Sequence, residues 1–390
     1  MKLLHTADWH LGVKTMGKDR LSGQKETIKE ICDIADINNV DVVVIAGDIY
    51  NTSVPTAEAE ELFYEAIEKL SNNGNRFVLV VSGNHDDPER LCAGDPLAYS
   101  HNILVAGDLE SKKVNRFVKG KQIAVVGTDY GFVKIKKGDE IMNIAYLPFD
   151  CTITETINFE DKNYSNIVKE LSSKTAKNFK DNEYNVFVSH LFAVGSRLFG
   201  DRSVSVGDVF AVSTSDLPKS DYIALGHIHG AQKLNNNAYY SGAISRLRAG
   251  EYEVSVNLVE FNNKQNINVE TIKLNSSEKY LDVVAHSIEE ARYELSKLEN
   301  KDLAQLNLIL SETLKSSELK QLKKDFPCIT SISLEIKAGD NFVETTPLSR
   351  RNLSDKELFV EFYKKKKGVE PKESLIEMFL KCKGGSNETN

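Results

Sequence analysis

Asp41-Val-Val-Val-Ile-Ala-Gly-Asp48 is an apolar run that ends directly at a glycine and a carboxylate, and Phe77-Val-Leu-Val-Val-Ser-Gly-Asn84 repeats the arrangement. Neither run alternates apolar with polar residues, which is typical of strands buried on both faces of a sheet. Between the two runs, apolar residues recur at helical spacing. They are Ala59, Leu62, Phe63, Ala66, Ile67 and Leu70. Strands that alternate with helices predict an α/β fold built in layers.

The same junction, a β-like run followed at once by a potential metal ligand, occurs five times. In an open α/β sheet, ligands bind outside the carboxyl ends of the strands, so we expect the five ends to converge on one crevice. Gly47, Gly83 and Gly226 each precede a ligand, and we expect them to supply backbone angles that other residues resist. The candidate ligands are Asp8, His10, Asp48, Asn84, His190, His227 and His229.

Taken singly, most of these junctions have an ordinary interpretation. A single histidine after a strand is more often a hydrogen-bonded structural residue, as we interpret His5, and Asn-His-Asp is a common turn cluster. Together they offer oxygen and nitrogen donors without thiolate, which favours Mn²⁺, Fe or Zn²⁺ over Mg²⁺ or Ca²⁺. Seven ligands exceed the need of one ion, so the set predicts two divalent ions that share Asp48, an arrangement suited to phosphoryl transfer. Mn²⁺ is the expected metal, with Fe, Zn²⁺ and Mg²⁺ as alternatives.

Composition predicts a soluble protein with several domains. The 390 residues exceed a usual single core, and 41% hydrophobic residues is ordinary for a globular chain. No apolar leader follows Met1 and no run is long enough to span a bilayer, so we expect a cytoplasmic protein. The five scattered cysteines lack a CxxC pair and are interpreted as reduced thiols. The net charge of -8 argues mildly against nucleic-acid binding, unless bound cations offset the carboxylates of the site.

The patterns divide the chain into a large α/β domain, a small α/β domain, a linker, a helical segment and a disordered tail. In the small domain, β-like runs alternate with helical patterns in the order βαβαβ. The helical segment carries the capping-box pattern Ser354-x-x-Glu357, and Pro371 can open a second helix. The expected bounds are 1–275, 276–338, 339–352, 353–382 and 383–390. The expected strands of the small domain are Leu281–Ala285, Leu303–Leu310 and Ile329–Ile336, and its helices are Ile288–Leu298 and Ser316–Lys324.

The order of the motifs resembles that of the calcineurin-like metallophosphoesterase superfamily. The motifs are Asp8-x-His10, Gly47-Asp48, Gly83-Asn84-His85-Asp86, His190 and Gly226-His227-x-His229. The resemblance implies a core of two sheets flanked by helices. It implies one ion bound by Asp8, His10, Asp48 and His229, and a second bound by Asp48, Asn84, His190 and His227. His85 is then no ligand: it faces the scissile phosphate and protonates the leaving oxygen, with Asp86 expected to orient its imidazole.

Longer stretches are similar to the SbcD family of nuclease subunits over most of residues 1–260. They include His5-Thr-Ala-Asp-Trp-His-Leu-Gly12, Asp221-Tyr-Ile-Ala-Leu-Gly-His-Ile-His229 and, beyond them, Glu357-Leu-Phe-x-x-Phe362. This resemblance implies a DNA nuclease for end processing and repair, with double-strand exonuclease and single-strand or hairpin endonuclease activity. It implies that residues 276–338 cap DNA and that residues 353–382 dock on an SMC-like ATPase partner, SbcC. It also implies a homodimer formed through residues 56–70 and 88–100.

Two departures from the family pattern leave alternatives open. Asn51 stands where family members commonly carry Asp or His, which leaves the balance of exonuclease and endonuclease activity open. Beyond Gly242 the match is weak, and Arg246 and Arg248 are candidate phosphate contacts there, although exposed arginines are as often mere surface. A superfamily enzyme acting on a small phosphodiester or a phosphoprotein would fit the acidic charge. A mainly scaffolding subunit would use the apolar stripe of the helical segment, which in a generic chain packs on its own domain.

Overall fold

A computed structural model defines the fold of the chain. It describes residues 1–110, 117, 121–149, 164–198, 210–251, 253–299, 302–311, 314, 316–336, 359–360, 363–364, 370–371 and 375–376. The chain forms two compact units. Met1–Ile309 and Leu314–Glu335 make up the first, and Leu310–Thr313 and Ile336–Asn390 make up the second.

A six-stranded sheet forms one half of the core of the first unit. Four of its strands are parallel neighbours, and two antiparallel strands extend the sheet beside β1. The two runs predicted as buried strands, β4 and β5, are buried at every residue. In sheet order the strands are β17 (Asn266–Lys273), β16 (Ser255–Asn263), β1 (Lys2–Thr6), β4 (Val42–Ala46), β5 (Phe77–Val81) and β6 (Ile103–Ala106).

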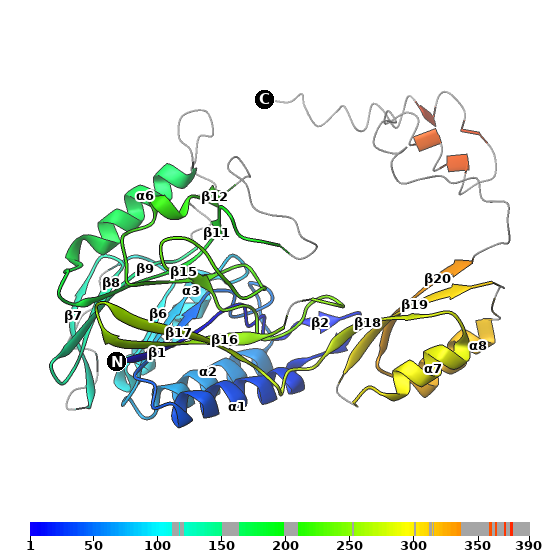
Figure 1. The fold of residues 1–390 in the computed structure, drawn as a ribbon, viewed down its shortest axis with the longest axis horizontal. Helices are drawn as coiled ribbons and strands as arrows, with labels where there is room; N and C mark the ends of the chain where they lie inside the picture. Colours follow the sequence, from blue (N-terminus) through cyan, green and yellow to red (C-terminus); the bar gives the residue numbers. More distant parts are fainter. Residues whose placement is uncertain are drawn as a thin grey trace. The chain divides into compact units, whose positions relative to one another are not determined.

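Two helices, α1 (Leu21–Ile37) and α2 (Ala57–Ser71), cover the outer face of this sheet (Figure 1). The apolar stripes predicted from helical spacing pack against alternate strand residues in one buried cluster. The helix α2 begins at Thr56, whose side chain accepts a hydrogen bond from the backbone N–H of Ala59. This cap satisfies a donor that the first turn would otherwise leave without a partner.

A seven-stranded sheet stacks on the first, and α6 (Tyr164–Thr175) covers its outer face (Figure 1). Side chains from the inner faces of both sheets form a shared cluster, in which Val44 and Leu79 join Val188 and Ala224. The layers therefore run helix, sheet, sheet, helix, which confirms the predicted fold. In sheet order the strands are β14 (Gln232–Lys233), β15 (Ala238–Tyr240), β13 (Tyr222–Gly226), β10 (Tyr184–His190), β9 (Glu140–Leu147), β8 (Phe132–Lys137) and β7 (Ile123–Asp129).

A separate three-stranded sheet has the predicted βαβαβ order. In its central strand, alternate residues such as Ala304, Leu306 and Leu308 are buried. Its elements are β18 (Tyr280–Ala285), α7 (Ile288–Ser296), β19 (Leu303–Leu310), α8 (Ser316–Asp325) and β20 (Ile329–Ile336). The expected strands and helices are confirmed to within a few residues. The boundary drawn at residues 275–276 stays a prediction.

Short elements connect these layers. They are β2 (Lys14–Thr15), β3 (Lys18–Asp19), α3 (Pro88–Leu91), α4 (Asp95–Ala98), β11 (Phe192–Ala193), β12 (Ala211–Val212) and the 3-10 turns Cys92–Gly94, Tyr99–His101, Ala176–Asn178 and Thr214–Asp216. Among the described residues, every helix is too short or too polar to cross a membrane.

Little of the second unit is described. Phe359 and Tyr363 lie with ring centroids 6.0 Å apart, one helical turn from each other. The predicted linker 339–352, the tail 383–390 and most of the helical segment 353–382 lie outside the described residues.

Candidate metal centre

The five predicted junctions meet where the carboxyl ends of strands from both sheets come together. The backbone N–H of Asp8 donates to the carbonyl of Gly47 at 3.0 Å, and that of His10 donates to the carbonyl of Asp48 at 3.0 Å. These bonds join the loop after β1 to the loop after β4. The backbone N–H of His227, after β13, donates to the Asp8 carboxylate at 2.9 Å and so brings in the second sheet.

Four of the candidate ligands have a left-handed backbone. The φ angles are 53° for Asp8, 46° for His10, 52° for Asp48 and 99° for His227. Such a conformation costs a residue other than glycine about 1–3 kcal/mol and persists only where its surroundings impose it. Strain gathered at four positions of one site supports a functional reason for this geometry.

The three glycines serve the site in two different ways. Gly47 has a φ of 89°, as the sequence predicts. Gly83 and Gly226 lack a positive φ, so the prediction of special backbone angles is wrong for them. A Cβ on Gly226 would lie 1.8 Å from the carbonyl oxygen of Ala46, and one on Gly83 would lie 2.2 Å from the backbone nitrogen of Asp48. Close approach of the loops, and not backbone conformation, excludes a side chain at these two positions.

A first group of donors consists of Asp8, His10 and His229, whose ligand atoms all lie within 4.8 Å of one another. The Nε2 atoms of His10 and His229 are 3.3 Å apart. The Nε2 atom of His10 also lies 3.6 Å from Oδ2 of Asp48. One oxygen of Asp48 thus belongs to this group.

A second group consists of Asp48, Asn84, His190 and His227. The Oδ1 atom of Asn84 lies 3.0 Å from Nε2 of His190 and 2.8 Å from Nδ1 of His227. The Nε2 atom of His190 lies 3.4 Å from Oδ1 of Asp48, the oxygen that does not face His10. The structure therefore brings all seven predicted ligands together and places Asp48 between the two groups, one oxygen to each.

The separations within each group fit donors that share a cation. Two donor atoms held about 2.1 Å from one ion at tetrahedral or octahedral angles lie roughly 3.0 to 3.4 Å apart. Nitrogen lone pairs that face each other, as at His10 and His229, repel unless a proton or a cation lies between them. The donor set, which is rich in imidazole and carboxylate, fits divalent ions of the Mn²⁺, Fe and Zn²⁺ type.

Protonation of these histidines is controlled by burial and by Asp48. Burial lowers the pKa of His10 and of His227 to about 3, so both rings are neutral and offer a lone pair. Burial opposes a charge on His190 as well, but the negative charge of Asp48 outweighs it and raises the pKa of His190 to about 9. The close contact between Asp48 and His190 therefore favours the charged form of each.

His85 lies beside the donors, and its side chain is partly exposed. Its ring centroid is 4.9 Å from that of His10, and its Nδ1 lies 2.8 Å from the carbonyl oxygen of Asn51. The predicted partner Asp86 is used elsewhere: its carboxylate accepts hydrogen bonds from the backbone N–H groups of Ile49, Tyr50 and Gly83. The prediction that Asp86 orients the imidazole is therefore wrong, because the Asn51 carbonyl takes that position.

Supporting groups that the sequence analysis missed surround the ligands. The Nδ1 atom of His190 contacts the carbonyl of Ala46 at 2.9 Å. The Nδ1 atom of His229 lies 3.1 Å from a carboxylate oxygen of Glu251. The buried amide of Gln24 donates to the carbonyls of Trp9 and His10. Gln24 and Glu251 stand in no recognisable motif, and only the folded chain places them beside the site.

The two candidate phosphate contacts differ. Arg246 is partly buried, and its guanidinium donates to the carbonyl of Glu278 at 3.2 Å, so it supports the fold. Arg248 is exposed. His5 is fully buried and contacts the hydroxyl of Tyr222 at 2.9 Å, in agreement with a structural role.

A four-layer α/β fold with carboxylate, amide and imidazole donors converging at strand ends defines a metallophosphoesterase. Residues 1–231 match the family described as calcineurin-like phosphoesterase, and the chain belongs to that family. Over its full length it is similar to proteins named as the SbcD component of the nuclease SbcCD. The protein of that name from Bacillus subtilis strain 168 is 27% identical over 407 residues, which cover 100% of this chain and 99% of that protein. The one from Staphylococcus epidermidis is 27% identical over 373 residues, with 93% of each chain covered.

Solved structures give weaker likenesses. GAP50, the anchor in the inner membrane complex of Plasmodium, aligns with a TM-score of 0.41 and 13% identity, over 81% of this chain and 98% of its own. A dimetal phosphatase from Danio rerio aligns with a TM-score of 0.37 and 10% identity, over 70% and 98%. Both scores are too low to carry an argument, so the family assignment rests on the sequence match.

Proposed function

We propose that this chain is a metal-dependent DNA nuclease that hydrolyses phosphodiester bonds with two divalent ions, most readily Mn²⁺. The observation that carries the proposal is the position of Asp48, which turns one carboxylate oxygen toward each group of donors. The first ion would be held by Asp8, His10, Asp48 and His229. The second ion would be held by Asp48, Asn84, His190 and His227.

Such ions, when bound, polarise the phosphoryl group and lower the pKa of water. The chain itself supplies a proton at His85. Contact of its Nδ1 with the Asn51 carbonyl at 2.8 Å fixes the ring, which leaves Nε2 free to donate. As a P–O bond to water forms and the ester P–O bond breaks, the protonated ring passes the proton on Nε2 to the leaving oxygen. The proton that the attacking water releases passes to solvent, and the neutral ring takes up a proton from solvent before the next cycle.

DNA as the substrate is supported by the relatives named as the SbcD component of the nuclease SbcCD, which match the chain from end to end. From the resemblance of its motifs to the SbcD family, we further propose that the chain acts in DNA end processing and repair, as an exonuclease on double-strand ends and an endonuclease on single strands and hairpins. The unit of β18, β19 and β20 would cap the DNA. An SMC-like ATPase, SbcC, is the proposed partner of the segment 353–382.

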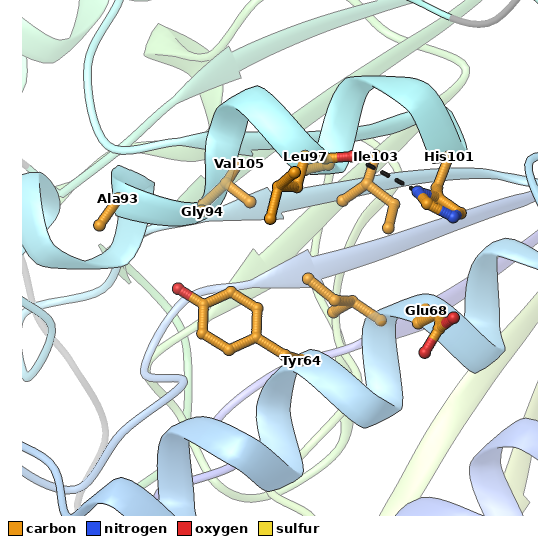
Figure 2. Close-up of a pocket in the computed structure, with 10 residues that line it drawn as sticks. Tyr64, Glu68, Ala93, Gly94, Leu97, His101, Ile103 and Val105 are labelled. Carbon is orange, nitrogen blue, oxygen red and sulfur yellow. Dashed lines mark hydrogen bonds between the residues drawn. The ribbon is translucent and has the colours of Figure 1, made fainter.

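A second copy of the chain is the proposed partner of a surface formed by residues 56–70, most of which belong to α2, and residues 88–100. Figure 2 shows Tyr64 of α2 facing Leu97 and Val105 across an apolar pocket of about 480 Å³. Leu97 is 78% exposed and Tyr64 is 38% exposed. Exposed apolar side chains around a hollow favour contact with another protein surface, and the resemblance makes that protein a second copy.

The decisive experiment is cleavage of single-stranded and hairpin DNA with Mn²⁺, by the chain alone and with its ATPase partner. Asp48→Asn serves as the matched variant, because it keeps the size of the side chain and removes the shared charge. We expect cleavage by the native chain and none by the variant. Absence of cleavage by the native chain, alone and with the partner, would overturn the proposal.

A phosphodiesterase acting on small substrates is the alternative within the family, and the net charge of -8 favours it. Turnover of bis(p-nitrophenyl) phosphate can be compared with turnover of DNA oligomers. Faster turnover of DNA supports the nuclease, and turnover of the small ester alone supports the alternative. A mainly scaffolding protein would process neither substrate.

A further inference from the structure

Glu251 joins a predicted metal ligand to a backbone turn. Its Oε1 lies 3.1 Å from Nδ1 of His229, and its Oε2 accepts hydrogen bonds from the backbone N–H groups of Leu247 at 2.6 Å and Arg248 at 3.0 Å. Both oxygens therefore have partners, and the side chain is 6% exposed. Because the Glu251 carboxylate cannot rotate freely, it can fix the direction of the His229 ring that it contacts.

His229 is held less firmly by packing than two other imidazoles of the site. Its side chain is 24% exposed, whereas those of His10 and His190 are at most 2% exposed. The direction of the His229 ring therefore depends more on its hydrogen-bond partner than the directions of the His10 and His190 rings do. When Nδ1–H donates to Glu251, the lone pair of Nε2 turns toward Nε2 of His10, 3.3 Å away.

The turn that carries Glu251 is itself held from outside the site. The backbone N–H of Gly250 donates to the carbonyl of Tyr280 at 2.9 Å, at the start of β18. Arg246 donates to the carbonyl of Glu278, and the Glu278 carboxylate pairs with the buried Arg20 at 2.7 Å. Glu251 thus rests on a turn that several contacts keep in place, which is what a positioning group needs.

We propose that Glu251 is a positioning residue, which fixes the tautomer and ring direction of His229 and so sets the metal affinity of the group formed by Asp8, His10 and His229. The proposal rests on the two-metal centre proposed above and adds a residue to it. Carboxylate partners of this kind raise the basicity of a histidine ligand, and their loss typically weakens metal binding about 10–100-fold.

The test is calorimetric titration of the chelator-treated full chain with Mn²⁺, without DNA. Glu251→Gln is the informative variant. The glutamine side chain has a single oxygen, which can accept a hydrogen bond either from His229 or from the backbone N–H groups of Leu247 and Arg248. Its NH₂ group would then face the remaining N–H donor. Glu253→Gln is the matched control, since Glu253 lies two residues away, is 64% exposed and pairs with Lys273.

We expect Glu251→Gln to bind Mn²⁺ about 10–100-fold more weakly at one of two sites, with the other site unchanged. Glu253→Gln should bind as the native chain does at both. Native affinity at both sites in Glu251→Gln overturns the inference, as does equal weakening of both, which would indicate general damage to the fold. Failure of the native chain to bind two ions would instead overturn the proposed metal centre. The metal-free unfolding temperature of each variant verifies that it is folded.

Discussion

Asp48 and His85 are neighbours in the site, and the backbone N–H of His85 donates to the Asp48 carboxylate at 2.9 Å. Their side chains have different contacts. Asp48 turns its oxygens to two groups of nitrogen donors, whereas His85 contacts a backbone carbonyl through Nδ1. We propose that Asp48 is a shared ligand and that His85 is a proton donor. These roles predict different losses on substitution.

Replacing His85 with alanine is expected to lower the rate of phosphodiester hydrolysis about 10²- to 10⁴-fold, the usual contribution of a general acid. Mn²⁺ affinity should stay at the native value, because His85 is outside the two proposed ligand sets. Rates on DNA and calorimetric titration measure the two quantities. Lys174→Ala, at an exposed residue of α6 outside the site, is the control. A parallel loss of metal affinity in His85→Ala would identify His85 as a ligand.

His5 predicts a dependence of stability on pH. Burial lowers its pKa from 6.5 to about 3 in the folded chain, so between these values the unfolded chain binds a proton that the folded chain excludes. The stability that this group contributes is present above pH 6.5 and is lost as the pH falls. His5→Gln should reduce the slope of the unfolding free energy by about 1.4 kcal/mol per pH unit between about pH 6 and 4. Urea unfolding in chelator measures it, and slopes equal to the native ones would contradict the assignment.

At the scale of single residues, the sequence predicted the candidate metal ligands better than it predicted the residues that hold them in place. Six of the seven predicted ligands follow strands and His190 ends β10. Because parallel strands bring their carboxyl ends together, residue type and position were enough to predict that these side chains lie close to one another. Asp86 was misassigned because adjacency in sequence to His85 says nothing of direction: its carboxylate turns back to three backbone N–H groups. Glu251 was missed because a turn in the loop after Gly242, and no motif, brings it to His229.

Among the elements, the contact between β13 and β4 is the tightest in the site. A Cβ on Gly226 would lie 1.8 Å from the carbonyl oxygen of Ala46, a backbone atom that cannot rotate away. Gly226→Ala should therefore lower the free energy of unfolding by about 3 kcal/mol, at the upper end for overpacking, and weaken Mn²⁺ binding. Gly127→Ala is the control in another strand, where the added atom would meet Lys134 at an ordinary 3.4 Å. Denaturant unfolding compares them, and equal stability would show that the loops can separate.

Element type was easier to predict than element pairing. The elements of the small sheet were expected within a few residues of where β18, α7, β19, α8 and β20 lie, because their apolar patterns are local. No local sequence pattern indicates that β16 pairs with β1. The paired residues, such as Leu3 and Val259, are far apart in the sequence. The order of strands within the two stacked sheets is therefore known only from the structure.

The whole molecule is expected to be a dimer through the surface of residues 56–70 and 88–100. Leu97→Asp would place a charge at the most exposed apolar residue lining the pocket, 78% accessible, and should convert a dimer to a monomer. Light scattering coupled to size-exclusion chromatography measures the mass. Ile37→Asp, at an equally exposed apolar residue at the end of α1 (77%), is the control. An unchanged mass for Leu97→Asp would locate the dimer interface elsewhere, and a monomeric native chain would remove the dimer from the proposal.

Removing residues 353–390 is expected to abolish binding of the ATPase partner and to leave metal binding and phosphodiester hydrolysis unchanged. Among the described residues, the buried clusters of the two large sheets are formed by residues up to Leu274, so we expect the metallophosphoesterase fold to form without the removed segment. The shortened chain should keep native Mn²⁺ affinity and native turnover of bis(p-nitrophenyl) phosphate, and it should fail to bind the SMC-like ATPase in a pull-down assay. A chain that lacks only residues 383–390 is the control and should still bind. Unfolding of the shortened chain would mean that the apolar stripe at Phe359 packs within the protein, and retained binding would place the docking surface outside this segment.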